Sequence, residues 1–462
     1  MTSAGLTWIA ALAAVSAVAS LPYWLPGVVV ALRVRIFVLI NGDEGIAVPG
    51  DRVGVEDFKR LYTDPAANGR SRGAALSDLF WYWLAPGPEV HQEHLEPGPR
   101  YDDVARTTRS TLTRLRRDEW AELVARCADR ELDRLAAHKR PGRAREVRLR
   151  DAMMPLWAAV YYEVVFDEPC PDEARDLIVT NADDVVSALK CTGLRHMGRR
   201  DRLTRYLRAR LASGAVPHAL PAALDDAEQV YYLQGTYFNT AVVQMSEAMA
   251  HLLLALAARP DLQRRLREEP EETGLIDRVI DETLRVYPLF GVAHRITSAD
   301  IALGEAAIPA GSVLLFNYPA FHHSGAPDAA AFDPDRWGRD HAEQLRHIPF
   351  GVGANRPCPA RAVAPLTMRV AARRVLRRYA LATAADHSRS LPNRGPCLLL
   401  PLGADPDAQR PPALRLARQR LRDRWEDVWR SLVQLVLGTY MVWDARRLRL
   451  CTTHFASQDG SR

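Results

Sequence analysis

Residues 349–360 read PFGVGANRPCPA, the most informative stretch of the sequence. It places Cys358 behind a glycine-rich loop and ahead of an amphipathic helical pattern that runs from Arg361 to Leu381. A cysteine at the start of a helix is held where backbone N–H groups and the helix dipole stabilise a thiolate. Such a sulfur can ligate heme iron, while a buried structural cysteine is the alternative that the loop alone leaves open.

Two charged patterns lie upstream of this loop. Glu282 and Arg285 stand three residues apart, which puts a carboxylate and a guanidinium on the same face of a helix. Between them and the cysteine, a proline-fixed turn with the sequence FDPDRW at 332–337 supplies Arg336. A lone Glu-x-x-Arg is a common surface ion pair, so the order and spacing of the three patterns carry the information.

In this order the three patterns resemble those of the cytochrome P450 family, over roughly residues 50–402. The resemblance implies a mainly α-helical fold with small β-sheets, in which heme b (iron protoporphyrin IX) lies between a distal and a proximal helix. It implies that Cys358 is the metal ligand and that Glu282, Arg285 and Arg336 form a buried structural triad, because buried charges must satisfy one another. The further cofactor-binding residues that it implies are Phe350, Gly353, Arg356, Arg295 and Arg106.

Arginine is the expected partner of the heme propionates, because a guanidinium binds a carboxylate through two hydrogen bonds. Arg356 and Arg295 match the family pattern by position. Arg106 rests on a poor match of residues 101–106 to the family's Trp-x-x-x-Arg.

The loop itself departs from the family pattern. Cys358 stands one residue further from Phe350 than is usual, so one residue is inserted between Gly353 and Arg356. Pro365 is expected to interrupt the helix that follows. We therefore expect a loop that bulges but keeps its ligand.

The distal helix is expected over Gln229 to Ala258. The family normally carries an acid and an alcohol here that relay protons to bound dioxygen. This pair is absent, and the nearest catalytic candidates are Asn239, Thr240 and Gln244. Either one of these side chains organises water, or the reaction needs no proton relay.

Composition supports a globular protein that does not bind nucleic acid. The chain has 462 residues, 48% of them hydrophobic, and a formal charge of +5 that is spread along its length. Nearly all basic residues are arginine, which indicates a bacterial source with a GC-rich genome. The six cysteines lie far apart without a C-x-x-C pair, so a reducing compartment is expected.

The chain divides into three predicted regions. Residues 1–45 form an apolar membrane anchor or an arm packed on the domain, and residues 46–405 form the catalytic domain, with short strands at 312–316 and 398–402. Residues 406–462 form a helical extension outside the family pattern, which lies on a membrane, on a partner or on its own domain. Its apolar residues at helical spacing are Trp425, Val428, Trp429, Leu432, Val436 and Tyr440.

The leading functional hypothesis is a cytochrome P450 monooxygenase, an oxidoreductase that uses dioxygen and external electrons on a lipophilic small molecule of secondary metabolism. A separate ferredoxin or reductase is the expected electron donor. Basic residues on the helix after Cys358 would steer it, unless they only reflect composition. These residues are Arg361, Arg369, Arg373, Arg374, Arg377 and Arg378. The expected location is the cytoplasm or the cytoplasmic side of a membrane.

Two other classes remain as alternatives. A heme-thiolate isomerase or lyase would need no dioxygen, which suits the missing acid–alcohol pair. A non-catalytic heme-binding protein is the third hypothesis. Gly351-x-Gly353 is a weak dinucleotide signal, and the histidine pairs at 91/94 and 322/323 lack a zinc-hydrolase pattern, so we interpret His322 and His323 as structural.

Overall fold

The computed structural model describes most of the chain, and the statements that follow concern those residues. They are 3–42, 45–72, 74–84, 94–137, 144–268, 274–304, 306–325, 328–339, 345–387, 391–403 and 413–459.

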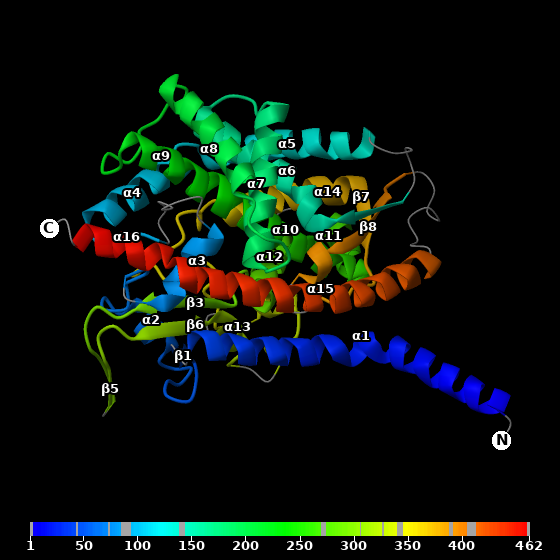
Figure 1. Cartoon of the computed structure of the whole chain (residues 1–462). Helices are drawn as coiled ribbons and strands as arrows, with labels where there is room; N and C mark the ends of the chain where they lie inside the picture. Colours follow the sequence, from blue (N-terminus) through cyan, green and yellow to red (C-terminus); the bar gives the residue numbers. More distant parts are fainter. Residues whose placement is uncertain are drawn as a thin grey trace.

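Most of the described chain is α-helical (Figure 1). The helices of the first half are α1 (Ser3–Asn41), α2 (Phe58–Thr63), α3 (Ala75–Leu84), α4 (Pro99–Thr113), α5 (Arg117–Ala137), α6 (Leu149–Phe166), α7 (Asp172–Leu189) and α8 (Met197–Ala212). Those of the second half are α9 (Asp226–Leu233), the π-helix η1 (Gln234–Ala241), α10 (Val242–Ala257), α11 (Pro260–Glu268), α12 (Leu275–Val286), α13 (Tyr318–His322), α14 (Ala364–Arg378), α15 (Ala413–Leu448) and α16 (Leu450–Asp459). Short 3-10 helices cover Pro334–Gly338 (η3) and Pro392–Arg394 (η5).

Small sheets complete the fold. One has the order β1-β6-β3 and another the order β2-β8-β7, while β4 and β5 pair alone. The strands are β1 (Ile46–Val48), β2 (Arg145–Arg148), β3 (Val292–Ile296), β4 (Ile301–Leu303), β5 (Ala306–Ile308), β6 (Val313–Asn317), β7 (Tyr379–Ala382) and β8 (Pro396–Pro401). The strands predicted at 312–316 and 398–402 appear as β6 and β8, and the prediction of a mainly helical fold with small sheets is confirmed.

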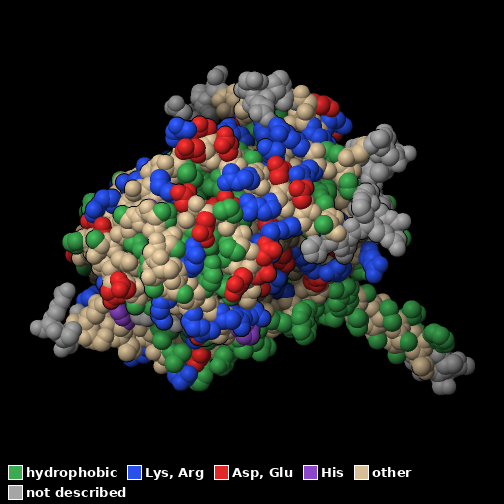
Figure 2. All heavy atoms as spheres, turned by 90° about the horizontal axis from the view of Figure 1, so that it is seen from above, with side chains coloured by type: hydrophobic (Ala, Val, Ile, Leu, Met, Phe, Trp, Pro, Cys, Tyr) green, Lys and Arg blue, Asp and Glu red, His purple; other side chains and the backbone are tan. Residues whose placement is uncertain are grey.

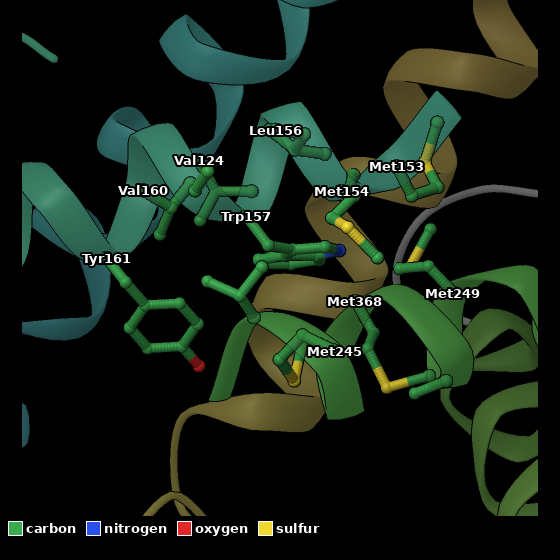
Figure 3. Close-up of a cluster of buried hydrophobic side chains, with 14 of the residues drawn as sticks. Val124, Met153, Met154, Leu156, Trp157, Val160, Tyr161, Met245, Met249 and Met368 are labelled. Carbon is green, nitrogen blue, oxygen red and sulfur yellow. The ribbon is translucent and has the colours of Figure 1, made fainter. Parts of the chain in front are cut away.

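The core lies where α6, α10 and α14 meet. Trp157 of α6 is fully buried there, and methionine side chains surround it (Figure 3). Met154 comes from α6, Met245 from α10 and Met368 from α14, so three helices share one apolar cluster. Burying each of these side chains stabilises the fold by roughly 1.5–3 kcal/mol. This cluster fixes α14 against α10.

The distal helix predicted over 229–258 is built from three consecutive pieces. Asp225 and Glu228 form a capping box that starts α9, which continues through η1 into α10. A π-helix accommodates an extra residue in its turns and occurs mostly at functional sites. The Asn239–Thr240 region lies inside η1.

The N-terminal helix α1 and the C-terminal helix α15 lie side by side on one face (Figure 1). α1 and α15 run in parallel, because Tyr23 meets Arg424 while Arg33 lies near Gly438 further along both helices. Two helices are long and apolar enough to cross a membrane, within the ranges given above. One is Thr7–Ile40, only 6% of which is buried over its most apolar window, and the other is the mostly buried Asp226–Ala257 of the core.

Candidate heme-thiolate site

A tight turn shapes the loop that carries Cys358. Val352 and Asn355 form an isolated antiparallel bridge, and the Cys358 N–H donates to the carbonyl oxygen of Phe350 at 2.9 Å. The amide nitrogen of Asn355 lies 2.9 Å from the carbonyl oxygen of Ala67, so the loop is tied to the segment after α2. The expected bulge is therefore a compact turn at the inserted residue.

The loop requires glycine at position 351. Gly351 has a φ of +70°, and a Cβ added there would lie 2.9 Å from the hydroxyl oxygen of Tyr62. At Gly353 an added Cβ would only make an ordinary 3.5 Å contact with the guanidinium of Arg361. The steric requirement thus falls on Gly351 and not on the predicted Gly353.

The helix after the cysteine starts later than predicted. α14 begins at Ala364, with Pro365 in its first turn, and ends at Arg378. Proline is favoured in a first turn because its missing N–H has no partner there in any case. Pro365 opens the helix instead of interrupting it, and Cys358 lies just before the turns at 359–363 that precede α14 rather than at the first residue of the helix.

Glu282, Arg285 and Arg336 meet in one buried cluster. The Arg285 guanidinium donates two hydrogen bonds to the Glu282 carboxylate, at 2.7 and 2.8 Å, and Arg336 Nε donates another at 3.0 Å. The backbone N–H of Asp333 and the indole N–H of Trp337 donate to the same carboxylate. Glu282 is fully buried, so its charge is held entirely by these donors.

His322 connects this cluster to the cysteine loop. Its Nε2 accepts a hydrogen bond from the Ile348 N–H at 3.1 Å, so its Nδ1 carries the proton and donates to the carbonyl oxygen of Arg285. Burial lowers the pKa of His322 to about 4, which keeps the ring neutral. These two hydrogen bonds, one to Arg285 of α12 and one to the chain just before the cysteine loop, support a structural role for His322.

A second buried arginine stands beside the cysteine loop. Arg295 on β3 is 2% exposed and donates to the hydroxyl oxygen of Tyr62 at 3.2 Å and to Asn355 Oδ1 at 3.5 Å. Its Nε has no hydrogen-bond partner among the residues that the structure places. These acceptors are neutral, so among the described residues the charge of Arg295 is buried without a carboxylate.

Arg356 follows Asn355, the residue of the cysteine loop that Arg295 contacts. It is 7% exposed, has a φ of +49°, and stacks over the ring of Tyr101 on α4 at 4.1 Å. Its guanidinium donates to the carbonyl oxygens of Asn68 and Leu95 at 2.9 and 2.7 Å. The chain just before Cys358 thus contains one buried arginine, Arg356, and contacts a second, Arg295, through Asn355.

Comparison with known proteins identifies this arrangement. The sequence model described as Cytochrome P450 matches residues 222–405, which contain the triad, Arg295 and the cysteine loop. The findings support a member of the cytochrome P450 family.

Curated cytochrome P450 relatives match parts of the chain. Cyclooctat-9-en-7-ol 5-monooxygenase of Streptomyces melanosporofaciens is 26% identical over 263 residues, which is 47% of this chain and 57% of that enzyme. Cytochrome P450 3A41 of Mus musculus is 28% identical over 173 residues, 33% of each chain. The alignments thus span between one third and somewhat over half of these relatives.

Solved structures share the cytochrome P450 fold at low sequence identity. A six-coordinated cytochrome P450 from Thermus thermophilus has a TM-score of 0.57 and 21% identity over 75% of this chain and 91% of that chain. A retinoic-acid-bound cyanobacterial structure has a TM-score of 0.59 and 18% identity over 75% and 88%. These similarities confirm the predicted fold.

The residues around the cysteine loop fit the propionates of heme b. A buried guanidinium without a carboxylate needs an anion, and the unpartnered Nε of Arg295 is such a vacant donor. Arg356 adds a second cation on the same loop. Arg295 and Arg356 would therefore hold the two propionates of heme b.

The structure does not bring Arg106 to this site. Its side chain is 71% exposed and pairs with Asp103 at 3.4 Å. Tyr101, from the same helix, contacts Arg356 instead. The match of residues 101–106 to the family pattern was poor. Tyr101, the first residue of this stretch, is the aromatic residue that contacts Arg356.

Asn239 is engaged in a buried network between η1 and α7. Its amide oxygen accepts a hydrogen bond from Asn181, which in turn accepts one from Gln234 at 3.1 Å. Thr204 of α8 donates to Gln234 at 2.6 Å. Asn239 therefore holds η1 against its neighbouring helices.

Thr240 and Gln244 have partly exposed side chains. Thr236, also in η1, has a buried hydroxyl without a hydrogen-bond partner among the placed residues. Thr236 lies upstream of the predicted candidates Asn239, Thr240 and Gln244, and the extra residue in the π-helix changes the register in which these positions face the site.

Acidic neighbours partly neutralise the arginines of α14. Arg369 pairs with Asp277 at 2.8 Å, and Arg374 pairs with Asp129 at 3.0 Å. Arg378 contacts the same Asp129 at 2.9 Å. These three arginines therefore form ion pairs that link α14 to α5 and α12.

A surface pocket of about 460 Å³ lies elsewhere, between α6, α7 and α8. Asp151, Asp183, Arg199 and Arg202 line it, and none of the site residues above does. This pocket is distinct from the cysteine site, because residues of both charge signs line it and no residue of the cysteine site does.

Proposed function

We propose that this chain is a heme-thiolate oxygenase, an oxidoreductase in which the Cys358 thiolate holds the iron of heme b. The observation that carries the proposal is the buried charge of Arg295 beside the cysteine loop, because it needs an anion that no described carboxylate supplies.

Each residue of the site has a distinct task in this proposal. Arg295 and Arg356 bind the propionates, and Tyr101 keeps the Arg356 guanidinium in place by stacking. The triad and His322 hold the loop rigid from below. When bound, heme supplies the activation of dioxygen, which thiolate ligation favours.

Tyr161 of α6 lies near the sulfur. Burial raises the pKa of its hydroxyl, and the nearby Cys358 thiolate raises it further, so Tyr161 stays neutral. In Figure 3 its hydroxyl points away from the helix that carries it. We assign Tyr161 to shielding the sulfur from water.

Proton delivery falls to the hydroxyls of the distal helix. Thr236 has an unpartnered buried hydroxyl, and Thr240 lies one turn further along η1. Asn239 is occupied by Asn181 and holds the helix. We therefore expect Thr236 or Thr240, with Gln244 as a further candidate, to organise water for proton transfer.

The substrate is a lipophilic small molecule of secondary metabolism. The name of the Streptomyces relative describes oxidation of a cyclic alcohol, which supports this class. A separate ferredoxin or reductase supplies electrons. The N-terminal helix associates with a membrane, with the catalytic domain in the cytoplasm, because α1 is apolar and almost entirely exposed.

The carbon-monoxide difference spectrum of the reduced protein tests the proposal, with Cys358→Ser beside the native protein. A red-shifted thiolate band that disappears in the variant supports it. Heme binding without that band in the native protein would assign another ligand, and absence of heme binding would overturn the proposal.

A heme-thiolate isomerase or lyase is the second candidate. The observation that favours it is the lack of an acid–alcohol pair in η1, together with the structural engagement of Asn239. Turnover without reductant and dioxygen would establish this reaction class. Strict dependence on both would exclude it, and Thr236→Val with Thr240→Val would then show which hydroxyl couples electron use to product.

A further inference from the structure

Exposed apolar side chains are concentrated on two helices. Of the large hydrophobic side chains that are exposed in the described chain, thirteen lie on α1, eight on α15 and only three elsewhere. Contiguous exposed apolar surface of this kind marks an interaction site. The catalytic domain itself is otherwise well covered.

α15 carries apolar residues on two opposite faces. One face packs on the domain through Met441, Val442 and Ala445, and Asn393 donates hydrogen bonds to Asp423 in the first half of the helix. The other face bears a stripe with a spacing of three or four residues. This outer stripe consists of Leu421, Trp425, Trp429, Leu432, Val436, Tyr440 and Trp443.

The outer stripe has no cover from the described chain. Trp429 is 69% exposed and Val436 is 66% exposed, although α15 is anchored along its whole inner face. The stripe extends over about 33 Å at 1.5 Å per residue. A helix that only covered its own domain would have a polar outer face.

α1 extends the apolar surface of α15 sideways. The hydroxyl of Tyr23 accepts a hydrogen bond from Arg424 at 2.8 Å, and the Arg424 guanidinium lies 4.9 Å from the Tyr23 ring. Further along both helices, a Cβ built at Gly438 would lie 4.0 Å from Arg33, so α1 and α15 are also neighbours there. The exposed faces of α1 and α15 thus form one two-helix apolar layer. Figure 2 shows hydrophobic side chains along this edge of the molecule and over the projecting part of α1.

The charges around the two-helix apolar layer indicate that it contacts a lipid surface. The stretch 431–443 of α15 contains no charged residue, and arginines stand before and after it. α1 has no acidic residue and carries Arg33 and Arg35 near its end. Tryptophan and tyrosine beside an apolar face with flanking arginines are typical of helices that lie in an anionic membrane interface. A second copy would bring like charges together across a symmetric contact.

We propose that α15 and α1 together lie in the plane of an anionic bilayer, and that the outer stripe of α15 is a membrane contact in its own right. This goes beyond an N-terminal anchor, because two parallel helices fix the orientation of the catalytic domain, whereas one leaves it free to rotate.

Vesicle flotation of the full-length protein tests this proposal. The variant carries Trp429→Glu and Val436→Glu, which alter exposed side chains and leave the inner face of α15 intact. The control carries Leu194→Glu and Phe290→Glu, which lie outside the layer. With vesicles of phosphatidylcholine and phosphatidylglycerol, the stripe variant should bind at least about tenfold more weakly than the native protein, whereas the control should bind equally well.

The outcomes separate the possible occupants. Native-like flotation of the stripe variant would overturn the proposal and leave α1 as the membrane contact. If lipid-free native protein forms a dimer that the stripe variant abolishes, the stripe belongs to a second copy, and the proposal is again overturned. Circular dichroism and the melting temperature report folding of each variant, and vesicle binding is independent of heme, so failure here would not affect the proposed oxygenase function.

Discussion

Arg285 and Arg295 lie ten residues apart and are buried almost equally, at 1% and 2% exposure. Arg285 donates two hydrogen bonds to the Glu282 carboxylate. Arg295 reaches only a tyrosine hydroxyl and an amide oxygen, and its Nε has no described partner. The two arginines therefore differ in their partner and not in their burial.

This difference separates a structural charge from a binding charge. A buried ion pair that is satisfied inside the protein fixes the fold and offers nothing to a ligand. A buried cation without a carboxylate is costly in the free protein and becomes favourable when an anion binds. The same residue type thus has opposite energetic consequences at the two sites.

The largest effect is expected from Glu282→Gln. The substitution leaves two buried arginines without their carboxylate, so the free energy of unfolding should fall by about 3–5 kcal/mol. Urea unfolding of the heme-free protein measures this loss in the free energy of unfolding. A loss below about 1 kcal/mol would contradict the structural assignment of the triad.

Arg295→Met should act in the opposite sense on the heme-free protein. Removing a buried cation without a carboxylate should leave the free energy of unfolding unchanged or raised, while heme affinity falls about 10- to 100-fold through loss of charge-assisted hydrogen bonds. Heme titration and urea unfolding measure the two quantities. Arg106→Met is the matched control, because Arg106 is exposed, and should change neither.

The free energy of unfolding should depend on pH through His322, which contacts the triad residue Arg285. The pKa of buried His322 is about 4, whereas an unfolded histidine has a pKa of about 6.5. The unfolded chain therefore binds more protons, and stability present above about pH 6.5 is lost as the pH falls toward 4. His322 alone should contribute about 2 kcal/mol between pH 7 and 5. Urea unfolding of His322→Gln should show a smaller pH slope, and an equal slope would exclude this origin.

The smallest effect concerns the cysteine loop. Gly351→Ala adds a Cβ at positive φ that meets the Tyr62 hydroxyl, and should cost about 1–2 kcal/mol of stability. Gly353→Ala should cost less than about 0.5 kcal/mol, because its added Cβ makes an ordinary contact. Melting temperatures of the pair compare them directly, and equal losses would refute the distinction.

The sequence predicts the parts of the site that depend on local spacing. Glu282 and Arg285 share a helix turn, and the loop order places Cys358, so both are visible in one chain. The helix start at Ala364 was misplaced because residues 359–363 form turns that an apolar pattern does not distinguish from a helix. Pro365 was misinterpreted for the same reason.

Contacts between distant segments could not be predicted. Tyr101 meets Arg356 and Tyr62 meets Arg295 only because α4, α2 and β3 pack around the loop, and no spacing in the sequence encodes this. Arg106 shows the converse, since its residue type fitted the task but its helix face points to solvent. The inner and outer faces of α15 likewise became distinct only once the domain lay against it.

The parallel contact of α1 with α15 also has a consequence for the order of synthesis. α1 ends at Asn41, whereas its neighbour starts at Ala413, so the ribosome makes the apolar helix long before the surface beside it. At translation rates of 5–20 residues per second the delay is roughly tens of seconds. During that time the apolar surface of α1 lacks its neighbour α15, so we expect a membrane or a chaperone to hold the nascent chain.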